Sequence, residues 1–181
     1  FLGPLSLRPQ HSFGRKNLYF SVMNVLQQSL IFSAVAFVLA LLQTPQSEYR
    51  VEIKKTDFKM YIYKGDSLVK TFSVAVGRNP GDKQRRGDFR TPEGSFSISQ
   101  IQDSQSWSHD FKDGKGSIGG AYGPLFLRFR WRGALSSPAR LWTGIGIHGT
   151  HDPASIGTMV TEGCIRLKNE EVQELAKLVK I

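Results

Sequence analysis

From residue 50 onward the chain consists of short runs of strand-forming residues, separated by breaks that contain glycine, proline, aspartate or serine. β-Branched and aromatic residues favour pleated strands, and breaks this frequent leave little room for long helices. The runs are RVEIKK, KMYIY, LVKTFSVAVG, GSFSISQI (94–101), PLFLRFRW (124–131) and GIGIHG (144–149). The sequence therefore predicts a mostly β domain, with a hairpin around the Lys64-Gly65-Asp66 turn.

One helix is expected near the end of the chain. Asn169 is a suitable N-cap, and Glu170 and Glu171 suit the positive end of the helix dipole. Four apolar side chains then fall on one helical face: Val172, Leu175, Ala176 and Val179. The sequence stops at Ile181 with little room for a closing strand, so we expect a domain that is truncated at its C-terminus.

Residues 1–47 differ in character from the rest of the chain. The uncharged run LIFSAVAFVLALL (30–42) follows Arg15 and Lys16. Because a membrane-spanning helix needs about 20 apolar residues, this run fits the core of an export signal best. An uncleaved membrane anchor and a buried core helix are the alternatives. Met23 is a candidate start site, and cleavage of the signal stays open.

We therefore expect an N-terminal extension (1–47) that contacts the membrane during export or as an anchor, followed by one exported domain (48–181). That domain would work in the periplasm or cell wall, either free or anchored to the cytoplasmic membrane. Lys and Arg outnumber Asp and Glu by 24 to 15. A basic surface suits nucleic acid or an anionic polymer, but no nucleic-acid-binding motif accompanies it, so nucleic acid is not an expected partner.

The reactive chemistry lies in two residues, His148 and Cys164, which are 16 positions apart. A single cysteine excludes an intramolecular disulfide and any site with several cysteine ligands. A thiol becomes a strong nucleophile only as thiolate, so it needs a nearby base. His148 ends a strand-like run, where its side chain can reach a cleft at the rim of a sheet. Each residue alone fits a structural role, but together they predict a nucleophilic site.

The segments around these residues resemble the L,D-transpeptidase (YkuD) catalytic domain family. The signature is carried by His148-Gly149-Thr150 and by Thr161-Glu162-Gly163-Cys164-Ile165-Arg166. Val76-Gly77-Arg78, Arg90-Thr91-Pro92-Glu93-Gly94-Ser95-Phe96 and Tyr122-Gly123-Pro124 resemble other family segments, so the likeness runs from about residue 49 to 181. Glu162 departs from the His or Lys of many members, which removes a cationic neighbour of the thiol.

This resemblance implies a single-domain mixed-sheet sandwich with one or two short helices, and a two-step acyl transfer on peptidoglycan stem peptides. Cys164 would attack a tetrapeptide donor at the carbonyl between the L-centre of its diamino acid and its terminal D-residue. An amine acceptor on a neighbouring stem would then resolve the thioester. No metal or other cofactor is expected. Two alternatives stay open: an L,D-carboxypeptidase or endopeptidase that uses water, and an inactive envelope-binding module.

Expected roles follow for the neighbours of the reactive pair. His148 is the base, and the Gly149 carbonyl orients its ring. Gly163 allows close approach of backbone amides that form an oxyanion hole. Arg166 is suited to bind a substrate carboxylate with its planar fork; an ion pair with Glu162 or Glu170 is the structural alternative.

The remaining features receive plainer interpretations. Tyr122 and Thr161 are expected at the substrate site because of the family resemblance. The glycine-rich segment DGKGSIGGAYG (113–123) is interpreted as a flap over the cleft, and His109 and His151 as loop residues. The three tryptophans, Trp107, Trp131 and Trp142, fit a hydrophobic core better than a carbohydrate platform.

Overall fold

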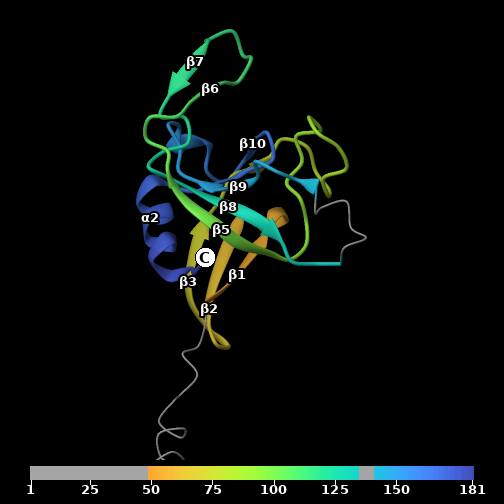
Figure 1. Cartoon of the computed structure of the whole chain (residues 1–181), viewed down its shortest axis with the longest axis vertical. Coiled ribbons are helices and arrows are strands. Elements are labelled where there is room, and N and C mark those ends of the chain that lie inside the picture. The colour runs from red at the N-terminus through yellow and green to blue at the C-terminus, as the bar shows by residue number, and fades with distance from the viewer. Residues whose placement is uncertain (1–48, 135–140) are drawn as a thin grey trace, which may run out of the picture. The chain divides into compact units, whose positions relative to one another are not determined.

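The computed structural model describes residues 49–134 and 141–181 (Figure 1). The N-terminal extension, its apolar run (30–42) and Met23 lie outside the described residues, so the export signal and the membrane contact stay predictions. Within the two described ranges, no helix combines the length and the apolar character that crossing a membrane requires.

Three antiparallel strands open the domain: β1 (Tyr49–Lys54), β2 (Lys59–Lys64) and β3 (Ser67–Ser73). A short 3-10 turn, Lys55–Asp57, joins the first two. The second and third pair across Gly65, whose positive φ of 58° suits the tight connection. The hairpin predicted around this turn is therefore confirmed.

The second sheet has four strands in the order β11-β9-β8-β5 and is mixed, because β9 and β11 run parallel while the other pairs are antiparallel. Its members are β5 (Phe96–Asp103), β8 (Leu125–Trp131), β9 (Gly146–His148) and β11 (Ile165–Arg166). Two small pairs complete the strands: β4 (Val76–Gly77) with β10 (Met159–Thr161), and β6 (Ser108–Asp110) with β7 (Ser117–Gly119). The predicted mostly β, mixed-sheet architecture is confirmed.

The C-terminal helix, α2 (Asn169–Leu178), is present, but its cap differs from the prediction. Lys168 is the N-cap, and its backbone N–H donates to the Glu171 carboxylate at 3.2 Å. Asn169 already belongs to the first turn, and its side-chain oxygen accepts a hydrogen bond from the Thr150 amide at 2.8 Å. The predicted cap was wrong because this amide group holds a distant loop instead of the helix end.

The core brings together apolar side chains from both larger sheets and the helix. Met60 and Ile62 of β2, Leu127 of β8, and Val172 and Leu175 of α2 are fully buried in one cluster. Burying a side chain of this size stabilises the fold by about 1.5–3 kcal/mol. The helix therefore packs its predicted apolar face against the sheets. The four-stranded sheet is anchored in this core, which fixes the positions of the residues at the ends of its strands.

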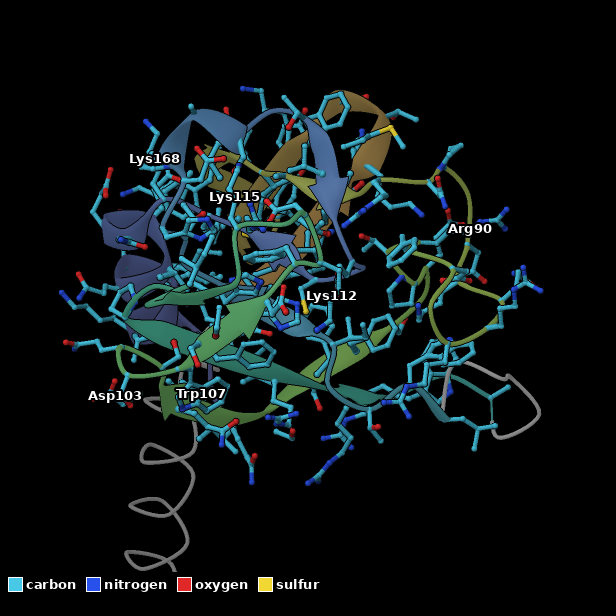
Figure 2. The ribbon with its side chains drawn as sticks, turned by 90° about the horizontal axis from the view of Figure 1, so that it is seen from above. Arg90, Asp103, Trp107, Lys112, Lys115 and Lys168 are labelled. Carbon is cyan, nitrogen blue, oxygen red and sulfur yellow. The ribbon has the colours of Figure 1, made fainter. Side chains whose placement is uncertain are left out.

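The β6–β7 hairpin stands at the end of the domain where β9 and β10 also lie (Figure 1). From above, Lys112 and Lys115 of its tip project over the middle of the domain (Figure 2). The glycine-rich segment interpreted as a flap thus forms the second half of a hairpin. Its base returns to the four-stranded sheet, because the Ser104 amide donates to the Pro124 carbonyl at 3.1 Å.

Candidate active site

A cleft of about 960 Å³ lies between the hairpin and the strand ends of the four-stranded sheet. His148, Cys164 and Arg166 line it together, with the histidine on one strand and the other two residues at the start of its neighbour. The hairpin and its flanks contribute Trp107, His109, Phe111 and Tyr122, and further lining residues are Lys83, Arg86, Phe89, Leu141 and Trp142. The two residues predicted to react are therefore in one cavity.

Strand pairing sets the position of both reactive residues. β9 ends at His148, and β11 begins one residue after Cys164. The two strands pair in parallel, with Arg166 opposite His148 and Ile165 opposite Ile147. Arg166 is also fixed on its other side, since its backbone exchanges hydrogen bonds of 3.0 and 3.1 Å with Ala75. Cys164 therefore falls level with Gly146, two residues before His148, so base and nucleophile lie on adjacent parallel strands.

His148 is buried and held in one orientation. Its side chain is 4% exposed, and Nδ1 lies 2.6 Å from the Gly149 carbonyl oxygen, which can only accept. Nδ1 therefore carries the proton, and Nε2 is left as an acceptor. The ring stacks on Phe126, with centroids 5.5 Å apart, and meets the edge of Tyr122 at 4.9 Å. Burial lowers the pKa of His148 to about 3, although the Gly149 hydrogen bond opposes that effect.

Cys164 is partly exposed in the cleft, and its thiol donates a weak hydrogen bond to the Gly144 carbonyl at 3.6 Å. Burial by the surrounding protein raises the pKa of the thiol to about 11. A hydrogen bond with the Gly146 backbone, and the charges of Arg166 and Arg128, act in the opposite direction. Both shifts favour a neutral thiol and a neutral imidazole in the resting cleft, rather than a thiolate–imidazolium ion pair.

This resting state predicts how the free thiol reacts with iodoacetamide. Because only the thiolate reacts and the pKa of Cys164 is raised to about 11, the alkylation rate should rise about tenfold per pH unit from pH 7 to 10. The rate is measured by intact-protein mass on the free enzyme. A plateau below pH 8 would instead reveal an ion pair in the resting site.

The loop before the nucleophile is held by Thr161 and shaped by Gly163. The Thr161 hydroxyl donates to the Cys164 carbonyl at 2.6 Å and accepts the Gly163 amide at 3.1 Å. Gly163 has a φ of +130°, and a Cβ there would lie 2.8 Å from the Arg90 carbonyl. The Gly163 amide is thus occupied inside the loop. Among the described residues, the Cys164 amide has no backbone acceptor, so it is free to donate to a ligand in the cleft.

Gly149, Gly123 and Asn169 form a tight junction beneath the base. The Asn169 side-chain oxygen accepts the Thr150 amide, and a Cβ on Gly123 would lie 2.7 Å from both the Gly149 Cα and the Thr150 nitrogen. Gly123 also has a φ of +64°, which an L side chain rarely adopts. These close contacts explain how Tyr122, which precedes Gly123, comes to lie against the ring of His148.

Arg166 is 5% exposed, and its Nη1 donates to the Ser155 hydroxyl at 3.2 Å. Nε is buried with no hydrogen-bond partner, and Cζ lies 5.4 Å from the centre of the Phe111 ring. Burial lowers the pKa of Arg166, while the charge of Asp152 raises it. The expected alternative, an ion pair with Glu162 or Glu170, does not occur within the described ranges. A buried guanidinium without a bonded carboxylate therefore faces the cleft.

His109 is the residue whose importance the sequence interpretation missed. It lies in β6 rather than in a loop, and its Nε2 is 3.3 Å from the Glu162 carboxylate. Its Nδ1 is 3.1 Å from the Tyr122 hydroxyl. The three side chains are 13 to 53 positions apart along the chain, so no local pattern could have linked them.

The tryptophans also differ from expectation. Trp107 and Trp142 line the cleft, so the core interpretation was wrong for these two. Trp131 packs its ring against Phe96 at a centroid distance of 5.2 Å. Lys83 lies over the Trp142 ring and pairs with the buried Asp88 at 2.7 Å. Across 49–134 and 141–181, no three His, Cys, Asp or Glu side chains gather in a way that could hold a metal ion.

Comparison with known sequences places these features in a family. The model of the L,D-transpeptidase catalytic domain, YkuD, matches residues 48–181. The YkuD protein of Bacillus licheniformis is 33% identical over 131 residues, which is 72% of this chain and 60% of that protein. The YqjB protein of Bacillus subtilis is 28% identical over 137 residues, or 76% of this chain and 69% of that protein. The chain thus spans less than two thirds of the first relative.

Solved structures share the fold at low sequence identity. Bd1075 of Bdellovibrio bacteriovorus aligns with a TM-score of 0.50 and 19% identity, over 75% of this chain and 45% of that chain. The catalytic domain of the E. faecium L,D-transpeptidase also aligns with a TM-score of 0.50, with 18% identity, over 75% of this chain and 93% of that chain. With the match over 48–181, these findings confirm the resemblance: the chain belongs to the L,D-transpeptidase catalytic domain family.

Proposed function

We propose that the chain is a transpeptidase that joins peptidoglycan stem peptides through a thioester on Cys164, with His148 as the base. The observation that carries the proposal is the placement of these two residues on adjacent parallel strands in one cleft, with His148 Nε2 left as an acceptor. Peptidoglycan lies outside the cytoplasmic membrane. The proposal therefore includes export, which the apolar run 30–42 supports.

In the first step, the sulfur of Cys164 attacks the donor carbonyl while its proton moves to Nε2 of His148. The thiol needs this transfer because its pKa, raised to about 11, keeps it neutral at physiological pH. The imidazole in turn releases the proton readily because its pKa is lowered to about 3. The leaving nitrogen of the D-residue takes that proton, the C–N bond breaks, and a thioester remains.

Developing charge on the carbonyl oxygen needs a donor close to Cys164. The Cys164 amide is suited to this role because the neighbouring Gly163 amide is already bonded to Thr161. In the second step, the amine of another stem attacks the thioester. The C–S bond breaks, the sulfur leaves as thiolate, and the new amide joins the two stems.

Arg166 is proposed to bind the donor carboxylate and so to place the scissile carbonyl over the sulfur. Its buried Nε has no protein partner, which is costly unless a ligand supplies an acceptor. The adjacent Nη1 is held by Ser155, so the guanidinium plane is fixed before substrate arrives. A carboxylate then meets a preformed fork rather than a mobile chain.

Arg166→Ala should lower kcat/KM by about 10- to 150-fold, because a charged hydrogen bond contributes roughly 1.5–3 kcal/mol. Arg166→Lys should recover only part of this loss, since it keeps the charge but not the fork. Both variants are assayed with a donor stem and with iodoacetamide, whose reaction needs no carboxylate recognition. Full activity of the lysine variant would refute recognition by a planar fork. Parallel losses in melting temperature and thiol reactivity would indicate a structural role instead.

The function itself is tested by mixing the enzyme with a defined tetrapeptide stem and weighing the products. Cross-linked dimers with loss of the terminal D-residue support the proposal. Shortened monomers alone would show that water resolves the thioester, as in a carboxypeptidase. Absence of any product, together with absence of a covalent adduct on Cys164, would leave the binding-module alternative.

A further inference from the structure

A second hydrogen-bonded array, separate from the His148–Cys164 pair, reaches the same cleft. It consists of Tyr122, His109 and Glu162, joined by contacts of 3.1 Å from the tyrosine oxygen to Nδ1 and 3.3 Å from Nε2 to the carboxylate. All three line the cleft. The array crosses from the flap hairpin to the loop that carries the nucleophile, because Glu162 stands two residues before Cys164.

The chemistry of its members fixes the direction of the hydrogen bonds. An ionised carboxylate can only accept, so Nε2 of His109 carries the proton toward Glu162. Nδ1 of the neutral ring is then an acceptor, and the Tyr122 hydroxyl must donate to it. The remaining lone pair of the tyrosine oxygen is therefore available to accept a proton. Desolvation raises the pKa of Tyr122, and the charge of Cys164 adds to the effect, so the phenol is neutral at rest.

The outer end of the array is held by a cation. Arg78 lies 3.7 Å from the first carboxylate oxygen of Glu162, which leaves the second oxygen for His109. Arg78 itself packs over the Phe89 ring at 4.4 Å. The carboxylate is thus fixed in position and remains near the surface, where its side chain is 37% exposed. A proton that reaches Glu162 can leave to water.

The two imidazoles of the cleft have different hydrogen-bond partners. His148 is buried, its pKa is lowered to about 3, and its Nδ1 partner is a neutral carbonyl. His109 instead has two side-chain partners, because its Nε2 lies 3.3 Å from the Glu162 carboxylate and its Nδ1 lies 3.1 Å from the Tyr122 hydroxyl. The second half of the reaction requires a base, because an amine that attacks a thioester must lose a proton. The array that contains His109 is suited to this step, because Tyr122 can take a proton at one end while Glu162 accepts one at the other.

We propose that Tyr122, His109 and Glu162 take the proton of the acceptor amine when that amine attacks the thioester on Cys164. The inference rests on the proposed function. Tyr122 is the member that touches substrate, whereas His109 and Glu162 act through it.

The step balances as follows. The neutral amine forms the new C–N bond, and the carbonyl π pair moves to oxygen. The nitrogen proton passes to the Tyr122 oxygen while the tyrosine proton moves to Nδ1 of His109, and the Nε2 proton moves to Glu162. The oxygen pair then re-forms the carbonyl and the C–S bond breaks, which releases the thiolate of Cys164. Glu162 gives its proton to water, and the thiolate takes one back.

The test uses an acetyl-enzyme made with p-nitrophenyl acetate, whose formation does not depend on stem recognition. Decay of the thioester is followed by intact-protein mass with either a lysine-type amine or 2-mercaptoethanol. A thiolate nucleophile has no proton to lose, so it serves as the internal control. In Tyr122→Phe, which keeps the ring against His148, aminolysis should fall roughly 100-fold while thiolysis changes less than about twofold. His109→Gln, which keeps a donor for Glu162, should show the same selective loss.

His151→Gln is the matched control, because this exposed histidine contacts Phe111 but lies outside the array. It should leave both rates unchanged. Equal loss of aminolysis and thiolysis in Tyr122→Phe would show that Tyr122 only shapes the cleft, and unchanged aminolysis would show that another group takes the proton. Failure of the proposed function would give a different result. The wild-type enzyme would then form no cross-linked stems, although aminolysis of its acetyl thioester would still be slowed by Tyr122→Phe.

Discussion

Cys164→Ala is expected to abolish stem cross-linking, with a fall of at least about 10⁴-fold, because no other group can form the thioester. The fold should survive. The side chain is only partly buried and lines an open cleft, so its removal leaves no closed cavity in the core. Product masses report the activity, and circular dichroism with a melting curve reports the fold.

Cys164→Ser provides the matched comparison for this result. It preserves size and a hydroxyl, but an alcohol is far harder to ionise than a thiol beside the same weak base. It should therefore be nearly as inactive as the alanine variant. Substantial turnover by either protein would remove Cys164 from the nucleophile role, and loss of folded signal in the alanine variant would show that the thiol supports the core.

The second large effect concerns His148. His148→Gln should lower kcat/KM by about 10²- to 10⁴-fold at neutral pH, since general-base catalysis contributes on that scale. The ring lies between Phe126 and Tyr122, and glutamine fills more of that space than alanine does. The loss should therefore come from proton transfer rather than from a collapsed cleft.

Alkaline pH distinguishes these two causes. A thiol whose pKa is raised to about 11 needs the base below that pH and ionises unaided above it. Acylation of the glutamine variant by the donor stem should therefore approach the wild-type rate as pH rises toward 11, while the two rates differ most near pH 7. A constant deficit at every pH, accompanied by a lower melting temperature, would mean that His148 mainly supports the structure.

Much of this arrangement could be predicted from local sequence. The hairpin around Gly65 and the strands at 94–101 and 124–131 follow from side-chain alternation and turn chemistry, both of which act between near neighbours. The apolar face of α2 follows from helical spacing in the same way. The reactive pair, Cys164 and His148, could be predicted because a thiol nucleophile needs a base nearby and because the segments around both residues resemble the family signature.

The remaining features depend on contacts that no local pattern encodes. His109 and Glu162 are 53 positions apart, and their meeting requires the flap hairpin to fold back over the nucleophile loop. Asn169 looked like a helix cap because asparagine favours that position. In the folded domain, however, its side-chain oxygen accepts a hydrogen bond from the Thr150 amide instead. The strands β10 and β11 have only three and two residues, which is too short for periodicity to reveal.

Parallel pairing of β9 with β11 has a consequence for how such enzymes diverge. Ser155, Thr161 and Glu162 of the crossover contact the site, but the meeting of base and nucleophile is fixed by the register that sets Arg166 opposite His148. One residue inserted within β11 would turn its side chains to the other face. Selection on the reaction therefore acts on the register between two strands as well as on the reactive residues themselves.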